Sequence, residues 1–596
     1  MLQALGHRGP DETGVQICDT VGLAHARLAI VDPGSAGHQP MTHPSGRWVL
    51  AFNGEIFNHL ELRALLPPAD YFGHSDTETL LYAIAEWGEG AISRCNGMFA
   101  FAALDHTERR LLLVRDRFGK KPLYIARHNG ALWFASELKS LLAAEIPRRA
   151  RRELLAHAAG TGWLHGPDTP IDGVSRLAPG TVASVNLDTL ETTERRWYDP
   201  ANAVDPQLAT ELAGLSRVQL MRRVEAELRD SVHRRLMSDV PIGTMCSGGL
   251  DSSLISALAC EVQPGIVAFN AALDDDPRRD ERHWAERVAR ELGLELRTVH
   301  ISASSWRRAL VPAVEHYEYP LAHESSIPIA EIAALARSSG VKVLLTGEGA
   351  DELFGGYSFL HRELYRRFLP RRAQLARVVD RLRRVGLRGL PVAAVRAARR
   401  GRPRPCLEPA VQSERFERAV AREAENAYSH HAGARRDLEA ALLSELSGGV
   451  LPLLLNRMDK NAMQASVEAR VPFLDPQLVS LVLNLPLEHR IGPEPKGILR
   501  DVAAAHLSRR VARRPKQIGL ECDVRRYLLA GARPEFLEQG SLQETLGIER
   551  ERWQTTVRQC GESHALSLWT AEIWCRLTLE SEPRATVESE LWSDPE

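Results

Sequence analysis

The sequence has few of the features that mark membrane proteins, secreted proteins or metal scaffolds. No run of apolar residues approaches the roughly 18 that cross a bilayer. The first residues, MLQALGHR, have neither the apolar core nor the cleavage site of a signal peptide. The eight cysteines form no CxxC or Cys/His metal pattern and lie far apart, at positions 18, 95, 246, 260, 406, 522, 560 and 575. We therefore expect scattered, reduced thiols in a cytoplasmic protein without membrane contact.

Neither sign of charge dominates the chain. Lys and Arg number 75 against 77 Asp and Glu, a net charge of −2, so no overall field favours nucleic acid as a partner. Arginine is concentrated in residues 361–405, which include Arg399-Arg-Gly-Arg-Pro-Arg404. Aromatic residues do not alternate with these arginines as a nucleic-acid platform requires. We interpret this segment as a solvated helical insertion, with an anionic partner as the alternative.

The 596 residues exceed what one hydrophobic core usually serves, so at least two domains are expected. In residues 1–200, short apolar runs alternate with turn signals. Strands are predicted at 21–30, 48–52, 98–104, 111–114 and 132–135, and helices at 77–87 and 137–142. This pattern indicates a sheet-rich α+β domain.

A polar stretch at 201–218 is the predicted linker, and the rhythm changes after it. Strands at 242–246, 267–272, 298–301 and 341–345 alternate with helices at 219–237, from 252, at 283–292 and at 329–338. Such alternation predicts a doubly wound parallel sheet, here over 219–535, with ligands at the carboxyl ends of its strands. Residues 536–596 are expected to form a C-terminal helical extension.

The strongest single motif is Ser247-Gly-Gly-Leu-Asp-Ser-Ser253, which follows a predicted strand and opens a helix. Its glycines let the backbone wrap an anion, and the free N–H groups of the helix can hold phosphate. The serine hydroxyls add donors, and Asp251 could hold a magnesium ion that bridges phosphate oxygens. The motif is not a GxxxxGK[ST] loop, because no lysine follows the glycines.

A second glycine-rich loop, Thr346-Gly-Glu-Gly-Ala-Asp-Glu-Leu-Phe-Gly-Gly-Tyr357, follows the strand at 341–345. It gathers the carboxylates of Glu348, Asp351 and Glu352 at a strand's carboxyl end. A solvated turn or a calcium loop is the alternative, but the spacing does not fit an EF-hand. Further motifs follow in order: Asn456-Arg-Met-Asp-Lys-Asn-Ala-Met463, Ser466-Val-Glu-Ala-Arg-Val-Pro-Phe-Leu-Asp475, Pro495-Lys-Gly-Ile-Leu-Arg500 and Arg514-Pro-Lys-Gln517.

The SGGLDSS loop resembles the pyrophosphate loop of ATP pyrophosphatases, and the motifs together resemble glutamine-dependent asparagine synthetases. The resemblance implies that ATP and Mg²⁺ serve to adenylate the aspartate side chain, and that ammonia then displaces AMP to give asparagine. It implies a pyrophosphate grip by Ser247, Gly248, Gly249, Leu250, Asp251, Ser252 and Ser253. It places the adenosine pocket at Met245, Ala271, Thr346 and Gly347. Asp251 and Asp351 would hold Mg²⁺, Glu348 would be the general base, and Lys496 would offset phosphate charge. Arg470 and Asp459 would be structural or would orient substrate.

The N-terminal part resembles the glutaminase domain of class II amidotransferases. The resemblance rests on His7-Arg-Gly-Pro-Asp11, Ala26-Arg-Leu-Ala-Ile-Val-Asp32, Asn53-Gly-Glu55, Ser75-Asp-Thr-Glu78 and Arg115-Asp-Arg-Phe-Gly-Lys-Lys-Pro-Leu-Tyr124. It implies an αββα sandwich of the N-terminal-nucleophile hydrolase type. Arg27 and Asp76 would clamp glutamine, Asn53 and Gly54 would form the oxyanion hole, and Glu55 would line the same pocket.

The sequence departs from this pattern at its start. The family nucleophile is a cysteine at residue 1, whereas this chain begins Met1-Leu2 just before the RGPD motif, and Cys18 is internal without a free amine. We expect the nucleophile and first strand to be absent from this sequence. A start codon placed too far downstream and a genuine loss are both open explanations. The retained glutamine-pocket residues favour the first.

A second departure lies at residues 317–328, where the family usually carries acidic residues and this chain has Tyr319 and His323. Aspartate is the expected acceptor, with another carboxylate, such as a sugar acid, peptide or polyketide, as the alternative. A β-lactam-forming relative and an inert scaffold are further alternatives. The expected partners are small molecules, namely the acceptor acid and glutamine or ammonia. The oligomeric state is open, with a homodimer as one option.

Overall fold

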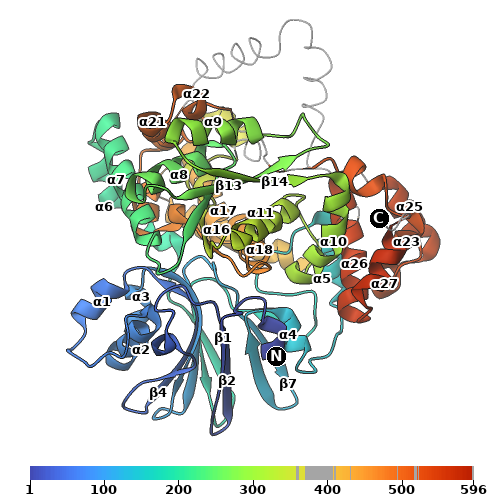
Figure 1. Ribbon diagram of the computed structural model, residues 1–596, viewed down its shortest axis with the longest axis horizontal. Coiled ribbons are helices and arrows are strands. Elements are labelled where there is room, and N and C mark those ends of the chain that lie inside the picture. Colours follow the sequence, from blue (N-terminus) through green and yellow to red (C-terminus); the bar gives the residue numbers. More distant parts are fainter. Residues whose placement is uncertain are drawn as a thin grey trace, which may run out of the picture.

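The computed structural model describes residues 1–357, 362–368, 407, 411–429, 431, 433–492, 494–515, 520, 522–560 and 562–592. Figure 1 shows an N-terminal half rich in long strands, with a second, helix-rich half built on it. The C-terminal helices gather at one side of the second half. The predicted Arg-rich insertion, apart from residues 362–368, lies outside the described residues.

The N-terminal half contains a six-stranded antiparallel sheet in the order β11-β10-β6-β5-β4-β3, and two smaller sheets, β1-β2 and β8-β7-β9. The strands are β1 Glu12–Cys18, β2 Val21–Arg27, β3 Met41–Thr42, β4 Trp48–Ile56, β5 Gly97–Asp105, β6 Arg110–Arg115, β7 Tyr124–His128, β8 Ala131–Ala135, β9 Val174–Arg176, β10 Thr181–Asn186 and β11 Thr192–Arg196. The helices are α1 His59–Leu65, α2 Asp76–Trp87, α3 Gly90–Arg94, α4 Leu138–Leu142 and α5 Arg152–Thr161.

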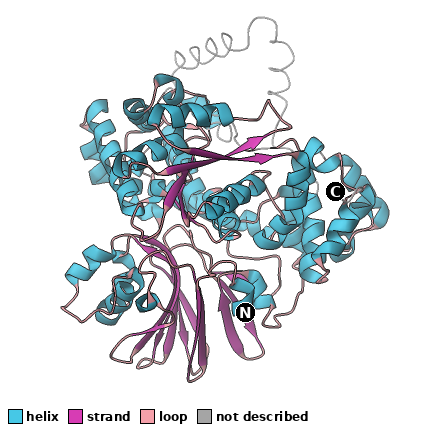
Figure 2. Ribbon diagram, in the orientation of Figure 1, coloured by secondary structure: helices cyan, strands magenta, loops and turns pink. Residues whose placement is uncertain are grey.

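Strand β5 is buried along its whole length and divides two layers of core. Because side chains alternate along a strand, Phe99 and Phe101 pack with α1, α2 and α3, whereas Ala100 and Ala102 pack against β1-β2 and β7-β8. A helical layer, the large sheet and a second layer of strands are therefore stacked in that order (Figure 2).

The C-terminal half contains a five-stranded sheet in the order β14-β13-β12-β15-β16, and every pairing in it is parallel. Its strands are β12 Ile242–Met245, β13 Val267–Leu273, β14 Leu296–Ile301, β15 Val343–Leu345 and β16 Glu468–Arg470. The predicted parallel sheet is confirmed. Because β12 and β15 are neighbours, the two glycine-rich loops leave the sheet side by side.

Helices cover both faces of this sheet. The helices of this half are α6 Pro206–Ala213, α7 Arg217–Arg235, α8 Leu250–Val262, α9 Arg282–Leu292, α10 Ala303–Tyr317, α11 Ser326–Ser338, α12 Ala350–Phe354, α13 Arg362–Phe368, α16 Val411–Ala427, α17 Gly433–Ser447, α18 Leu451–Met463, α19 Pro476–Leu483, α20 Leu487–Arg490, α21 Gly497–His506 and α22 Arg509–Ala512. One face packs against α7, α8, α19 and α21, and the other packs against α10, α11 and α18.

The C-terminal helices pack against α5 and α10. They are α23 Pro534–Glu538, α24 Ser541–Leu546, α25 Arg550–Gln559, α26 Glu562–Trp574 and α27 Arg584–Leu591. The buried side chains of Trp553, Trp569 and Trp574 join the core that also holds Leu154 and Leu155 of α5. This extension therefore ties the second half to a helix of the first.

Several observed elements differ from the sequence-based expectations. The strand predicted at 21–30 ends at Arg27, the last residue of β2 that pairs with β1. Helix α6 occupies part of the predicted linker at 201–218, because Asp205 caps it, Pro206 starts it and Leu212 is buried. Helix α10, which contains Pro312, was not among the predicted elements.

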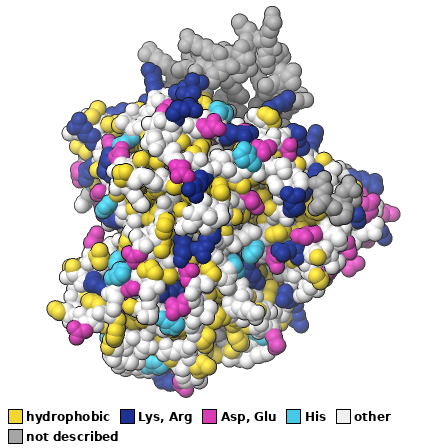
Figure 3. Space-filling model, viewed as in Figure 1, with side chains coloured by type: hydrophobic (Ala, Val, Ile, Leu, Met, Phe, Trp, Pro, Cys, Tyr) yellow, Lys and Arg dark blue, Asp and Glu magenta, His cyan; other side chains and the backbone are white. Residues whose placement is uncertain are grey.

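One helical stretch in the described part of the chain, Arg435–Met463, is long and apolar enough to cross a membrane by length and composition. Of its most apolar window, 61% is buried inside the protein, as in a core helix. On the face shown in Figure 3, Lys and Arg side chains are mixed with Asp and Glu, which agrees with the balanced composition.

Candidate active site

The first glycine-rich loop joins β12 to α8. Gly248 has a φ of +70°, and a Cβ at this position would lie 2.5 Å from backbone atoms of Trp284 and Ala285, so only glycine fits. Its carbonyl accepts a hydrogen bond from Arg514 Nη1 at 2.8 Å. The hydroxyls of Ser247 and Ser252 lie 3.0 Å apart. The loop is therefore held in shape by its own contacts, with the N-terminus of α8 behind it.

The second loop joins β15 to α12 and touches the first. A Cβ on Gly347 would lie 2.9 Å from the backbone nitrogen of Ser252 and 3.0 Å from Asp251 Cβ. Gly349 has a φ of +90°, and a Cβ there would lie 2.7 Å from Leu474. Gly347 thus allows the two loops to approach each other, a role that differs from the ligand contact predicted from the sequence.

The two loops line one cavity of about 460 Å³, a volume within the range of small-molecule sites. Most of the predicted synthetase residues line it: Met245, Ser247, Gly249, Leu250, Asp251, Ser252, Thr346, Gly347, Glu348, Asp351 and Lys496. Gly248, Ser253 and Ala271 do not. Ala271 points into the core beneath α10 and α11, and its neighbours Phe269 and Asn270 line the cavity instead.

Lys496 lies between the two carboxylates predicted to hold magnesium. Its Nζ is 2.5 Å from Asp251 Oδ2 and 2.7 Å from Asp351 Oδ1. Burial alone would lower the pKa of Lys496, but Asp251 and Asp351 outweigh it and raise the pKa, so the amine is an ammonium. Lys496 and Asp351 also press against Gly356, where a Cβ would meet Asp351 Oδ1 at 1.7 Å.

The convergence of Asp251 and Asp351 on one ammonium shows that their oxygens can share a cation. Two carboxylates suit Mg²⁺ when substrate phosphates complete its coordination. Among the described residues, no group of three His, Cys, Asp or Glu side chains could hold a metal ion. The residues present therefore fit a cation that arrives with phosphate.

Glu348 lies on another wall of the cavity and is held by Arg457 of α18. Arg457 Nη2 donates to Glu348 Oε1 at 3.1 Å, and its Nη1 donates to Ser325 Oγ at 3.0 Å. Behind this wall, burial and then Asp351 and Glu348 raise the pKa of Glu352 to about 8. Glu352 accepts a hydrogen bond from Tyr357 at 3.0 Å, so it acts as a buried support.

A second, smaller cavity of about 100 Å³ lies in the N-terminal half. All the predicted glutamine-pocket residues line it: Arg27, Asn53, Gly54, Glu55 and Asp76. Gly54 has a φ of +152°, and a Cβ there would lie 2.0 Å from the carbonyl oxygen of Met98. Asp76 accepts from the backbone N–H groups of Ile56 and Thr77 at 2.7 and 2.8 Å. Burial raises the pKa of Asp76 to about 6.

No cysteine is among the described residues that line this smaller cavity. Cys18 ends β1 and packs in the apolar layer between the sheets, with Val21 and Leu23 among its neighbours. The expectation that Cys18 is not the nucleophile agrees with this position.

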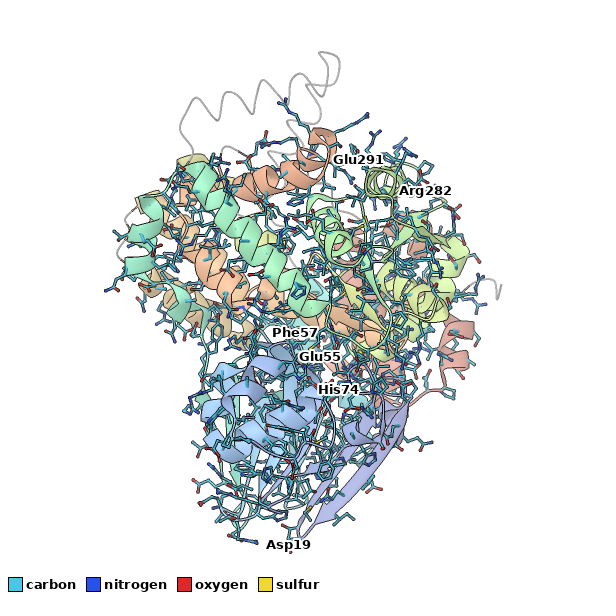
Figure 4. The ribbon with its side chains drawn as sticks, turned by 60° about the vertical axis from the view of Figure 1, so that its left-hand side comes forward. Asp19, Glu55, Phe57, His74, Arg282 and Glu291 are labelled. Carbon is cyan, nitrogen blue, oxygen red and sulfur yellow. The ribbon has the colours of Figure 1, made fainter. Side chains whose placement is uncertain are left out.

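Buried ion pairs connect the smaller cavity to the second half. Arg470 is 3.0 Å from Glu468 and 3.6 Å from Glu55, and Arg8 is 2.9 Å from Asp459. Neither Arg470 nor Asp459 lines the larger cavity, so both have positions suited to a structural role. Figure 4 shows Glu55 and Phe57 at this junction, whereas Asp19 lies at the far tip of the N-terminal half.

The sequence-based predictions missed several residues of the larger cavity. They are Trp163, Phe269, Asn270, Glu281, Ser325, Tyr357, Arg457 and Arg514. Arg457 lies in the motif Asn456–Met463, where its charge resembles that of any helix surface. Trp163 comes from the N-terminal half, and no motif marks it.

Comparisons with known proteins cover both halves. Residues 223–582 match the family described as asparagine synthase, and residues 1–198 match the glutamine amidotransferase domain. A Bacillus subtilis protein named asparagine synthetase (glutamine-hydrolyzing) 1 is 30% identical over 552 residues, which cover 89% of this chain and 84% of the relative. A putative asparagine synthetase (glutamine-hydrolyzing) of Mycobacterium tuberculosis H37Rv is 32% identical over 621 residues, with 95% and 91% covered. The chain therefore belongs to the asparagine synthase family.

Proposed function

We propose that this chain is a C–N ligase that makes asparagine from aspartate, ATP and ammonia, and that glutamine is the source of ammonia in the complete reaction. The observation that supports it best is the larger cavity, where both glycine-rich loops, the Asp251–Lys496–Asp351 cluster and Glu348 meet. The relatives of this chain described above are named as asparagine synthetases or putative asparagine synthetases.

In the first half-reaction, an oxygen of the aspartate side chain attacks the α-phosphorus of ATP, and pyrophosphate leaves. The backbone N–H groups of the Ser247–Ser253 loop and the N-terminus of α8 bind the phosphates. Mg²⁺, held by Asp251 and Asp351, would neutralise phosphate charge when bound. Lys496 then faces the departing pyrophosphate and stabilises the negative charge that develops on it.

In the second half-reaction, ammonia attacks the adenylated carboxyl carbon and AMP leaves. The nitrogen must lose a proton as the amide forms, and Glu348 is the carboxylate we assign to accept it. Arg457 fixes the Glu348 carboxylate at 3.1 Å, so the base is oriented before substrate binds. General-base catalysis of this kind commonly contributes about 10²–10⁴-fold.

The smaller cavity is assigned to glutamine. Arg27 would bind its carboxylate and Asp76 its amine, and Asn53 with Gly54 would stabilise the oxyanion. These side chains all line one cavity, which supports a common ligand.

The finer classification is also part of the proposal. We assign the αββα N-terminal-nucleophile hydrolase type to residues 1–200 and the ATP-pyrophosphatase type to 219–535. Residues 201–218 are the proposed linker and 536–596 the extension. A cytoplasmic location and a homodimer stay predictions.

The test is a product balance. Purified protein receives ATP, MgCl₂, aspartate and ammonium chloride, and AMP, pyrophosphate and asparagine are quantified; glutamine then replaces ammonium. We expect the three products in equal amounts with ammonium. ADP and phosphate in place of AMP and pyrophosphate would contradict adenylation, and AMP formed only with another acid would contradict aspartate as the acceptor.

A further inference from the structure

The N-terminal half contributes one aromatic side chain to the cavity of the C-terminal half. Trp163 follows α5 and Gly162, which has a φ of +75°. Its ring lies 4.6 Å from that of His323, centroid to centroid, at an interplanar angle of 81°. Both side chains line the cavity that also contains Glu348 and Arg457.

The loop that carries His323 is held by α5 of the N-terminal half and by α26 of the C-terminal extension. A Cβ on Gly162 would lie 2.9 Å from Ala322 Cα, so α5 packs directly on the loop. From α26, Thr570 Oγ1 accepts from the Leu321 N–H at 2.8 Å, and Trp574 Nε1 donates to the Glu318 carbonyl at 2.8 Å. Figure 1 shows α5, α10 and α26 together at this place. The Trp163–His323 pair is therefore preorganised.

The carboxylates that line the cavity already have cationic partners. Within the described residues these carboxylates are Asp251, Glu281, Glu348 and Asp351. Lys496 pairs with Asp251 and Asp351, Arg514 with Glu281, and Arg457 with Glu348. An amino-acid acceptor brings an α-ammonium into this cavity, and that group needs a partner.

The side chains of His323 and Trp163 can both interact favourably with an ammonium group. Burial, followed by the charge of Arg457, lowers the pKa of His323 to about 3, so the imidazole is neutral at physiological pH. Its Nε2 is buried without a hydrogen-bond partner among the described residues. A neutral imidazole keeps a lone pair on one ring nitrogen, which can accept an N–H from a ligand in the cavity. An indole ring attracts ammonium groups through its π electrons.

We propose that Trp163 and His323 form the receptor for the α-ammonium of the acceptor amino acid. The inference rests on the proposed function, in which that acid is aspartate. In this proposal Trp163, a residue of the N-terminal half, helps to determine which acid the C-terminal half accepts. His323 provides the hydrogen-bond acceptor for the ammonium group.

The experiment compares aspartate with succinate, which has the same two carboxylates and no amine. The KM for aspartate is measured from AMP release. For succinate, either KM or the inhibition constant against aspartate is measured. In Trp163→Leu and in His323→Leu, the preference for aspartate over succinate should fall about tenfold, whereas the constants for succinate and for ATP should stay within about twofold.

Two conservative variants keep the test independent of folding defects. Trp163→Phe retains an aromatic face and should keep most of the preference. His323→Glu supplies an anion and should keep or increase it. Leucine variants that retain the full preference, or that weaken succinate as much as aspartate, would overturn the inference while the proposed function stands. Wild-type protein that releases AMP with neither acid would overturn both.

Discussion

Gly356 offers the sharpest test of the Asp251–Lys496–Asp351 cluster. A Cβ on this residue would lie 1.7 Å from Asp351 Oδ1 and 2.5 Å from Lys496 Cε. Gly356 is not among the residues with positive φ, so its backbone accepts alanine without strain. Gly356→Ala is therefore expected to displace two functional side chains and to leave the backbone in place.

The size of the effect follows from the distances. An ordinary contact requires about 3.4 Å, so Asp351 Oδ1 must move by more than about 1 Å, and a displacement of that size can cost about 10²-fold in rate. This corresponds to about 2.7 kcal/mol of transition-state stabilisation. Both obstructing atoms belong to side chains that can rotate, so the melting temperature should change little.

The assay is AMP release with ATP, MgCl₂, aspartate and saturating ammonium, with the melting temperature measured in parallel. Gly22→Ala is the matched control, because a Cβ on Gly22 meets nothing within 4 Å and should leave kcat unchanged. A Gly356→Ala protein that folds normally and keeps kcat within threefold of wild type would refute the placement of Asp351 and Lys496 in the reaction.

Three further predictions concern other charged groups. Lys496→Met removes the cation shared by Asp251 and Asp351 and should lower kcat for AMP release by at least about 10². It should also lower the melting temperature, because two carboxylates lose their buried cation; near-normal kcat would contradict its role. In Glu352→Gln, the sign follows from the raised pKa of about 8: the wild-type stability contributed by protonated Glu352 is complete below pH 4.5 and is lost as the pH rises through 8. The variant should therefore gain in free energy of unfolding over wild type between pH 4.5 and pH 8, by at most on the order of 5 kcal/mol, and parallel urea titrations that show a constant difference would argue against a buried acid. Arg470→Met removes a buried cation that pairs with Glu468 and lies 3.6 Å from Glu55, while Lys121 still pairs with Glu468. It should lower the free energy of unfolding in urea by about 3 kcal/mol, whereas Arg109→Ala, at an exposed ion pair, should have no measurable effect.

The sequence predicted those parts of the site that depend on local backbone chemistry. Ser247–Ser253 and Thr346–Tyr357 carry glycines where the chain must make a close approach. Each loop follows a predicted strand, and in the structure these two strands are neighbours. The residues predicted to bind glutamine each lie in a short motif, and they lie together in the structure. Most residues of the first set line the larger cavity, and all of the second set line the smaller one.

The rest of the site depends on long-range packing, for which the sequence has no local signal. Trp163 reaches the larger cavity only because α5 packs against α26, a helix about four hundred residues away in the chain. Ala271 was assigned to the adenosine pocket by family position, but it packs in the core, whereas Phe269 and Asn270 of the same strand line the cavity. Arg470 and Asp459 look like surface charges in the sequence, yet they lie in the buried junction between the two halves.

In the proposed reaction, the larger cavity adenylates a carboxylate. The most direct measurement uses aspartate labelled with ¹⁸O in its side-chain carboxylate, together with ATP, MgCl₂ and ammonium, followed by mass spectrometry of the products. Adenylation predicts that one ¹⁸O atom appears in AMP and none in pyrophosphate. Label in inorganic phosphate, or unlabelled AMP formed alongside asparagine, would contradict it.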